Sequence, residues 1–406
     1  MNIKKLSLYN FRNFIQAEVS FPEDAFLIAA APNATGKTNF LESIVMLLRG
    51  KSFRASNDEC IRWQQDNFII QGQIKHQGST SDIAMRYHQP TRKLRVDQDG
   101  VPISPVTFYA NYPLILFLPE DTFIFSRGPA QRRNFINRIL VGSPSYVSAL
   151  VQYQRVLKQR NVALKTASSF TDVLVWTELL TEHGATLWSQ RRNLASFFNT
   201  HLSDLYSKIS NEQRKFTVNL QANITAGDNF TSALEKVFSY EKRYGYTLYG
   251  PHRDDLQIIT EGKDISSVLS QGQTRSLIIA LKIAAHRYVE KITKQRPLFL
   301  LDEALSELDN KRQAALLANL PDTQIILTCT SVPTMLRSLD NIHLLNIESI
   351  LSSPKKDKKV RNNEPVQLEA KPASEPEEVE SNGVTPTHAD QATPNSKQVN
   401  IAKSVS

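Results

Sequence analysis

Three adjacent residues, Gly36, Lys37 and Thr38, form a triplet that could bind a phosphate group. Glycine leaves room for the backbone beside a phosphate, the lysine ammonium reaches the outer phosphates, and the threonine hydroxyl can bind Mg2+. The complete phosphate-binding loop (P-loop) pattern is Gly-x-x-x-x-Gly-Lys-[Ser/Thr], but Ala31 occupies the position of its first glycine. The triplet alone leaves two possibilities open: a nucleotide site with one departure, or an ordinary turn.

The sequence around the triplet predicts a strand, a loop and a helix. FLIAA at residues 26–30 is a short apolar run typical of a buried parallel strand, and NFLESIVMLL at residues 39–48 has apolar residues at helical spacing. In this order the backbone amides at the helix start point toward a phosphate. The residues expected to bind nucleotide are Ala31, Pro32, Asn33, Ala34, Thr35, Gly36, Lys37 and Thr38.

A second apolar run ends in two acids, Asp302 and Glu303, within RPLFLLDEALSELD at residues 296–309. A carboxylate at such a strand tip can bind Mg2+ through water, and its neighbour can orient and deprotonate an attacking water. We therefore expect Asp302 to join Thr38 at the metal, and Glu303 to be catalytic together with Lys37. Acids after an apolar run are also common as charges at helix N-termini.

Upstream of these acids, Ser270, Gly272 and Gln273 open a long apolar helix within residues 268–291. Amides at a helix start suit a phosphate, although Ser is also an ordinary helix N-cap. An ABC-type ATPase has its motifs in the order found here: a P-loop, then Ser-x-Gly-Gln, then Asp-Glu and SELD. In that class the signature loop completes the nucleotide site of a second copy.

The chain resembles the RecF family, bacterial DNA replication and repair ATPases related to the SMC proteins, over residues 1 to about 345. The segments that carry the resemblance are NFRNF (10–14), GKSFR (50–54), LPED (118–121), GPAQRRNFIN (128–137), YQRVLKQRN (153–161), YGPHRDDL (249–256), LSQGQTRSL (269–277) and LLDEALSELD (300–309). GPHRDD and SQGQ together are the most specific. The chain departs from the family at Ala31 and Ala34, where glycines are usual, and at Asn137, where Asp is common.

The resemblance implies ATP and Mg2+ as cofactors and an ATP-dependent, head-to-tail homodimer. It implies double-stranded DNA and single-strand/double-strand junctions as ligands, and RecO, RecR and RecA as partners in recombinational repair. Arg12 is expected to reach the nucleotide phosphates, as the matching Arg does in related ATPases.

Two hypotheses about turnover remain open. The first is a slow, DNA-stimulated ATPase that aids RecA loading, which Glu303 favours. The second is a nucleotide-gated DNA clamp with little or no hydrolysis, which Ala31 and Ala34 favour. A transporter-associated ABC subunit is a third candidate, disfavoured by GPHRDDL.

Four basic residues are candidates for DNA contact: Lys51, Arg54, Arg132 and Arg133. Contacts of such side chains with the DNA backbone give salt-sensitive affinity that does not depend on sequence. The alternative is that they only lie on a solvated surface. The 48 Lys and Arg against 40 Asp and Glu, a net charge of +8, permit an anionic partner without showing one.

The composition indicates a cytoplasmic protein. The chain has 406 residues with 41% hydrophobic content, enough for a large core, and only two cysteines, Cys60 and Cys329. No signal sequence opens it, and no apolar run reaches the roughly 18 residues of a membrane span.

The predicted fold is α/β, an ABC-type P-loop ATPase lobe with a helical insertion lobe and a disordered C-terminal tail. The ATPase lobe comprises residues 1–125 and 241–350, the helical lobe residues 126–240, and the tail residues 351–406. Asp99-Gly100 predicts a turn. Residues 146–209, nearly free of Gly and Pro, predict long helices with Trp176 and Trp188 in the core. The tail is basic, then acidic, and has no aromatic residue, so it cannot bury enough apolar area to fold.

Overall fold

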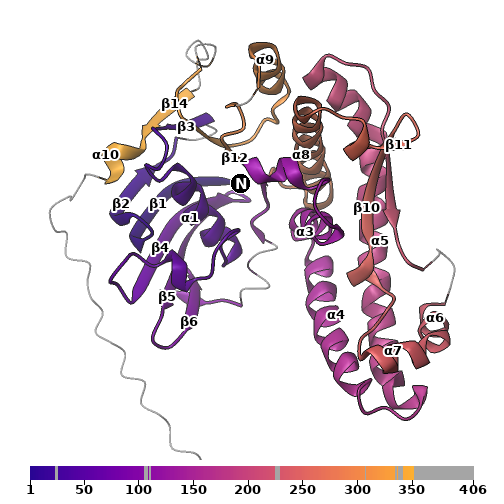
Figure 1. Cartoon of the computed structure of the whole chain (residues 1–406). Helices are drawn as coiled ribbons and strands as arrows, with labels where there is room; N and C mark the ends of the chain where they lie inside the picture. Colours follow the sequence, from indigo (N-terminus) through magenta and orange to yellow (C-terminus); the bar gives the residue numbers. More distant parts are fainter. Residues whose placement is uncertain are drawn as a thin grey trace, which may run out of the picture. The chain divides into compact units, whose positions relative to one another are not determined.

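The computed structural model describes residues 1–22, 26–104, 108, 111–224, 229–306, 308–333, 336 and 342–351. These residues form a mixed α/β fold with three sheets and several long helices (Figure 1). The predicted disordered tail, residues 351–406, lies outside the described residues except for Leu351.

The central element is a five-stranded parallel sheet in the order β14-β3-β13-β12-β8. Its strands are β3 (Phe26–Ala30), β8 (Leu114–Phe117), β12 (Leu298–Asp302), β13 (Ile325–Cys329) and β14 (Ile342–Asn346). The sheet therefore joins strands from both ends of the chain. The carboxyl ends of β3, β13 and β12 lie side by side, because Ala30 pairs with Cys329 and Thr328 pairs with Asp302.

Both faces of this sheet are buried along β3, β8, β12 and β13, which explains why these strands read as continuous apolar runs, whereas the edge strand β14 is largely exposed. Leu27 and Leu300 point into a core shared with the first helix and the antiparallel sheet. Ile28 and Leu301 point to the opposite side, into a core shared with the long helices. The alternation follows from the period of two residues along a strand.

The first core is closed by a six-stranded antiparallel sheet in the order β2-β1-β4-β5-β6-β7. Its strands are β1 (Asn2–Phe11), β2 (Phe14–Ser20), β4 (Asn67–His76), β5 (Ser79–His88), β6 (Lys93–Gln98) and β7 (Val101–Pro102). The helix α1 (Lys37–Arg49) contributes Phe40 and Ile44 to the same core. Asp99 and Gly100, at φ 52° and 82°, form the turn between β6 and β7, as predicted.

Helices fill the middle of the chain. They are α3 (Pro129–Leu140), α4 (Pro144–Ala163), α5 (Leu174–Ser210), α6 (Phe230–Lys236) and α7 (Phe238–Tyr244). In Figure 1, α4 and α5 run alongside each other. Trp188 is buried and Trp176 packs against the same core, so both predicted core positions are confirmed.

The remaining elements lie between or after those already described. They are β9 (Thr217–Gln221), β10 (Asp255–Thr260), β11 (Lys263–Asp264), α8 (Gln271–Thr293), α9 (Asn310–Asn319), α10 (Ile347–Leu351), and the 3-10 helices η1 (Asp58–Cys60), η2 (Pro119–Phe123), η3 (Phe170–Val173), η4 (Pro251–Arg253) and η5 (Ile265–Ser267). The helix α8 packs against both α5 and β8. Its Lys282 forms a buried ion pair with Asp121 at 2.7 Å, which fixes α8 to η2, directly after β8. Among the described residues, no helix combines the length and the apolar character needed to cross a membrane.

Candidate nucleotide-binding site

Thr38 and Asp302 meet at the carboxyl edge of the parallel sheet. The Thr38 hydroxyl donates a hydrogen bond to Asp302 Oδ2 at 2.9 Å, and Thr328, at the end of β13, donates to Asp302 Oδ1. Burial raises the pKa of Asp302, and the nearby Glu303 adds to the rise, while the two threonine hydrogen bonds oppose it. Hydroxyl and carboxylate oxygens are ligands that Mg2+ accepts, so Thr38 and Asp302 fit that ion.

Lys37 is buried at the base of the loop. Its ammonium donates to the carbonyl oxygens of Ala31 at 2.6 Å and Pro32 at 3.0 Å, and lies 3.0 Å from Glu303 Oε1. Glu303 Oε1 is itself buried and has no hydrogen-bond partner among the described residues, so the ion pair is its main interaction. The two predicted catalytic side chains are therefore in contact.

The backbone conformations of Ala31 and Ala34, the two alanines at usual glycine positions, differ. Ala34 has φ 66°, in the left-handed region that glycine adopts far more easily. Ala31 is not among the residues with positive φ, and its N–H donates to the Cys329 carbonyl at 3.2 Å. The substitution at Ala34 therefore carries backbone strain, whereas the one at Ala31 is accommodated.

Asn13 supports the loop from the turn between β1 and β2. Its amide donates to the carbonyl of Thr35 at 3.1 Å and its oxygen accepts from Asn39 at 2.7 Å. Gly36 has φ 107°, and a Cβ there would lie 2.4 Å from the Asn13 amide nitrogen. Gly36 is thus required both for backbone conformation and for the close approach of Asn13.

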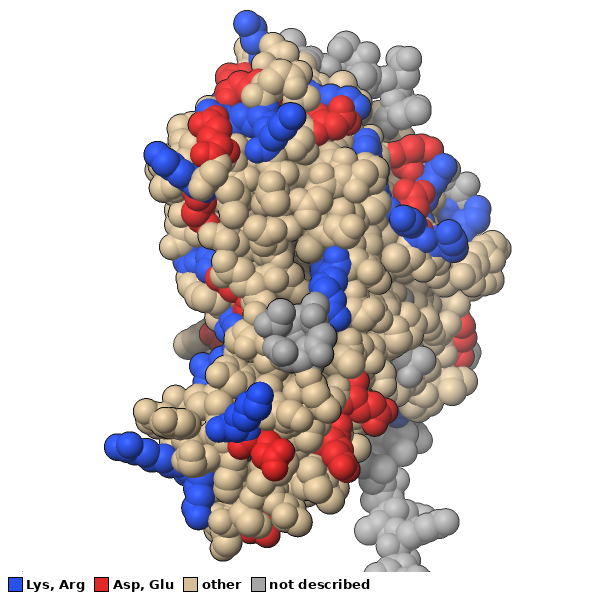
Figure 2. All heavy atoms as spheres, turned by 90° about the vertical axis from the view of Figure 1, so that its right-hand side faces the viewer, with Lys and Arg blue, Asp and Glu red and all other residues tan. Residues whose placement is uncertain are grey.

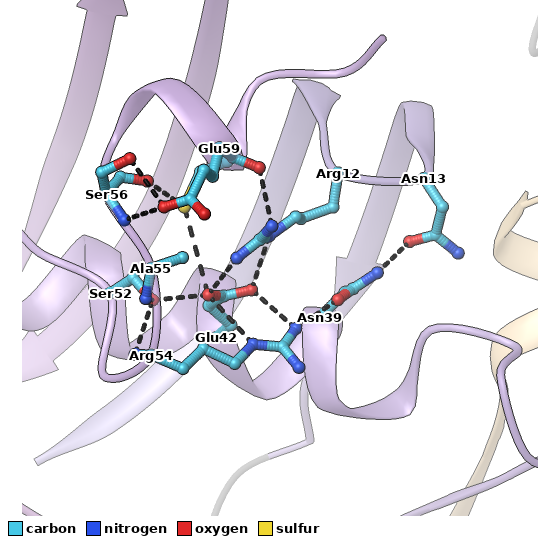
Figure 3. A network of polar contacts seen from close by, with 10 residues as sticks. Arg12, Asn13, Asn39, Glu42, Ser52, Arg54, Ala55, Ser56 and Glu59 are labelled. Atoms are coloured by element: carbon cyan, nitrogen blue, oxygen red, sulfur yellow. Dashed lines mark hydrogen bonds and ion pairs between the residues drawn. The ribbon is translucent and has the colours of Figure 1, made fainter.

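A fully buried carboxylate, Glu42, joins the three segments around this loop (Figure 3). Arg12 donates from Nε and Nη2 to Glu42 at 2.9 and 2.8 Å, and Arg54 Nη2 donates to it at 2.9 Å. Arg54 also donates to Asn39, and Arg12 donates to the Glu59 carbonyl. Burial alone would raise the pKa of Glu42, but hydrogen bonds from Arg12, Arg54 and Ser52 outweigh it and lower that pKa.

The predicted role of Arg12 at nucleotide phosphates stays a prediction, because here its guanidinium is held by Glu42. Glu42, Asn13 and Thr328 were not predicted from the sequence. For Glu42 the available signal was an acid inside an otherwise apolar helical stripe, next to Leu41 and Ile44.

Ser270 is the N-cap of α8. Its hydroxyl accepts from the Gln273 N–H at 3.3 Å, and the Gln273 side-chain oxygen accepts from the Ser270 N–H at 3.0 Å, a capping box. A Cβ on Gly272 would lie 2.9 Å from Arg312 Nη1. Among the described residues, no hydrogen bond or ion pair joins residues 270–273 to residues 31–38 of the same chain. Ser270, Gly272 and Gln273 thus open a helix as predicted, separate from the P-loop.

The four basic candidates differ in their contacts. Arg132 forms a two-pronged ion pair with Asp255 at 2.6 and 2.8 Å, and Arg133 donates to the Asp254 carbonyl at 2.8 Å. Lys51 is exposed. Arg54 shares the carboxylate of Glu42 and leaves 36% of its side chain accessible. Lys51 and Arg54 thus keep accessible charge, whereas Arg132 and Arg133 hold the GPHRDDL segment.

Asp254 of GPHRDDL is the centre of a buried polar network. It forms an ion pair with Arg191 at 2.8 Å and accepts from Trp188 Nε1 at 3.0 Å. Arg191 also donates to the Tyr146 hydroxyl at 3.0 Å, and that hydroxyl donates to Asn137 at 2.6 Å. The motif thus ties α3, α4 and α5 together, a role that the sequence did not predict.

Comparisons with known proteins identify the family. A family model described as an AAA domain matches residues 1–110. The DNA replication and repair protein RecF of Ruminiclostridium cellulolyticum is 34% identical over 348 residues, which cover 82% of this chain and 93% of the relative. The chain belongs to the RecF family. RecF of Geotalea uraniireducens is 32% identical and covers 86% of the chain and 96% of the relative.

Solved structures agree with the RecF assignment. A structure described as the recombination mediator protein RecF-ATP in the RecFOR pathway is 26% identical, has a TM-score of 0.76, and covers 85% of this chain and 96% of that one. The Smc head domain of Pyrococcus furiosus, at 16% identity and a TM-score of 0.50, shows a likeness in fold alone. The predicted RecF resemblance and ABC-type ATPase fold are confirmed.

Proposed function

We propose that this RecF-family chain is an ATP-dependent, DNA-binding factor of recombinational repair and replication restart. The observation that carries the proposal is the contact of Thr38 with Asp302 beside the buried ammonium of Lys37. This arrangement combines a phosphate-binding cation with two oxygen ligands for Mg2+ at one sheet edge. The solved RecF-ATP structure, at a TM-score of 0.76, supports ATP as the nucleotide.

The residues of the site have distinct roles in this proposal. Lys37 exchanges its contacts with the carbonyls of Ala31 and Pro32 for the outer phosphates of ATP. Thr38 and Asp302 would hold Mg2+, which would supply charge neutralisation at the phosphates. Glu303, released from its ion pair with Lys37, orients a water and accepts its proton.

Turnover requires a second copy of the chain. The amides and hydroxyl at the start of α8 are separate from the P-loop of their own chain, and ABC-type enzymes place this element on the partner's nucleotide. We assign Ser270, Gly272 and Gln273 to that contact in an ATP-dependent homodimer. The capping box of Ser270 and Gln273 pre-forms this helix start.

The ligand proposed for the dimer is double-stranded DNA near single-strand gaps, contacted through Lys51 and Arg54. RecO and RecR are proposed partners, because the similar solved structures are described as RecF of the RecFOR pathway, and RecA is proposed from the family resemblance. The same proposal includes a cytoplasmic location and two lobes. The ATPase lobe comprises residues 1–125 and 241–350, and the helical lobe residues 126–240.

A nucleotide-gated clamp with little hydrolysis is the second candidate, and the left-handed backbone of Ala34 at φ 66° favours it. One experiment separates the two: the steady-state ATPase rate with and without duplex DNA, with the mass by light scattering with and without ATP. An ATPase that DNA stimulates supports the first candidate. ATP-dependent dimers without turnover support the clamp, and a chain that neither dimerises nor hydrolyses ATP contradicts both.

A further inference from the structure

Two exposed tyrosines and an arginine form a stack at the end of α7. Tyr244 and Tyr246 are 56% and 40% exposed, and their rings stack with centroids 5.8 Å apart and planes at 27°. The guanidinium of Arg253 lies over the Tyr246 ring, 5.1 Å from its centroid. Aromatic rings with this much exposed surface contribute little to the hydrophobic core. Their exposed faces are available to bind a ligand.

Unpaired positive charge surrounds these rings. Lys242 and Arg243 immediately precede Tyr244, and the Lys165 side chain runs beside Gly245, where a Cβ would lie 3.7 Å from its Cγ. We call this surface the tyrosine platform; it consists of Lys165, Lys242, Arg243, Tyr244, Tyr246 and Arg253. All six residues are exposed, and none of its four cations forms a salt bridge with any described residue.

Two acids close to the platform, Glu241 and Asp172, already have other partners. Glu241 is fully buried and paired with Arg160. The carboxylate of Asp172, which lies within the electrostatic influence of Lys242, accepts the N–H groups of Ser168 and Ser169. Figure 2 shows Lys and Arg together with some Asp and Glu near its lower end, the level at which Figure 1 places α7.

A buried polar network underlies the tyrosine platform. Arg160 is fully buried and donates to Glu241 at 2.7 Å and to the Thr247 hydroxyl at 2.8 Å. Thr247 is also held by Asn161, and Leu248 N–H donates to Glu241 at 2.8 Å. The turn that carries both tyrosines is therefore fixed on either side by one buried ion pair, so the rings are pre-positioned.

A fixed aromatic stack among unpaired cations matches the chemistry of single-stranded nucleic acid. Unpaired bases stack on tyrosine and arginine faces while the backbone phosphates meet the cations. In a duplex the base faces are already covered, so duplex DNA could use only the charges. A protein partner would gain from the rings but has no general need for four free cations.

We propose that the tyrosine platform binds single-stranded DNA by base stacking, as a contact separate from the nucleotide-dependent duplex site. This inference rests on the proposed function, because it assumes that the protein is a DNA-binding factor. It places one arm of a gapped substrate, the single strand, at the α7 end of the helical lobe.

The test uses the full chain and fluorescence anisotropy with labelled oligo(dT) of about 20 nucleotides, longer than the ~4–16 nucleotides that one single-strand module covers. The Tyr244→Ala/Tyr246→Ala variant should lose about tenfold or more in oligo(dT) affinity, and change little on a duplex of the same length. Tyr244→Phe/Tyr246→Phe should bind like the parent, because stacking needs the ring and not the hydroxyl. Tyr9→Ala, which removes a tyrosine 45% exposed on β1, is the matched control.

Several results would overturn the proposal. One is oligo(dT) affinity like the parent's in Tyr244→Ala/Tyr246→Ala. The others are an equal loss of duplex affinity in that variant, or an equal loss of oligo(dT) affinity in Tyr244→Phe/Tyr246→Phe. Thermal unfolding checks that the Ala pair is folded. ATP-dependent mass and duplex binding, measured on the same variant, report on the proposed function; if these fail in the parent while the oligo(dT) result holds, only the function proposed above is wrong.

Discussion

The hydroxyl of Thr38 donates to the carboxylate of Asp302 at 2.9 Å, although 264 positions separate the two residues. Thr38 lies in the first turn of α1 and Asp302 at the end of β12, with β13 between β3 and β12 in the sheet. Thr328, at the end of β13, holds the other oxygen of Asp302. The pair proposed to hold Mg2+ is thus positioned by three strands, and substitutions there should affect nucleotide chemistry before they affect folding.

Lys37→Ala should abolish ATP binding. The ammonium is the buried cation of the loop, and charge-assisted hydrogen bonds of about 1.5–3 kcal/mol each would be lost at the phosphates. Titration with a fluorescent ATP analogue measures the change, and Lys51→Ala, an exposed lysine beyond the far end of α1, is the control. Parent-like affinity in Lys37→Ala would refute the P-loop assignment.

Glu303→Gln should keep Mg-ATP bound, slow turnover by about 10²–10⁴-fold and trap the dimer, because the amide cannot accept the proton from water. Asp302→Asn should instead weaken the dependence of ATP binding on Mg2+. Both variants are compared by single-turnover hydrolysis and by ATP binding over a Mg2+ series. Equal and mild effects of the two changes would show that this strand end has no catalytic role.

Ser270→Arg should leave ATP binding by the monomer nearly intact and block ATP-dependent dimerisation. A bulky cation at the start of α8 would displace the amides assigned to the partner's phosphate. Light-scattering mass with ATP, and DNA titrations at two salt concentrations, report the effect, and the salt dependence should flatten as phosphate contacts are lost. Ser267→Arg places the same charge three positions away, in η5, and should dimerise normally. If Ser270→Arg dimerises as well, α8 is only a capped core helix.

Ala34→Gly should stabilise the loop, because φ 66° costs an L-residue about 1–2 kcal/mol. We expect the free energy of unfolding to rise by about 1 kcal/mol, or ATP affinity to rise several-fold. Ala31→Gly is the matched control and should give no gain, since Ala31 lacks positive φ and glycine only adds freedom to the unfolded chain. Identical responses to the two changes would contradict the strain at Ala34.

Acid should destabilise the fold through the buried His286 and the partly buried His252. Burial lowers the pKa of His252 to about 4 and that of His286 to about 4. Tyr153 lies 2.7 Å from His252 Nδ1 and the Thr247 carbonyl 3.1 Å from Nε2, which a neutral ring satisfies. Because the folded pKa lies below the unfolded value, this stability is present above about pH 6.5 and is lost as pH falls toward 4.

The expected loss between about pH 7 and pH 5 is on the order of 1–2 kcal/mol per histidine. Urea unfolding at both pH values measures it. His252→Gln should flatten the pH dependence, whereas His88→Gln, an exposed histidine, should not. An unchanged slope in His252→Gln would show that His252 does not carry the effect.

Local sequence patterns predicted much of this site. The strand before the P-loop, the helix after Ser270 and the placement of Asp302 at a strand tip follow from short apolar runs and capping residues, so they were visible in the sequence. The partners of Glu42 and Asp254 were not. Each is a buried acid whose arginines lie on other elements, and no local periodicity encodes which distant cation neutralises a buried charge.

The P-loop strand β3 has β13 (Ile325–Cys329) on one edge and β14 (Ile342–Asn346) on the other, and both lie near the end of the described chain. During synthesis, most of the described chain must therefore be made before β3 can pair with either neighbouring strand. Until then its open edges are sites for wrong pairing, which slow, long-range parallel sheets expose longest. Chains that stop before β13 should therefore aggregate, because β3 then has neither of its neighbouring strands.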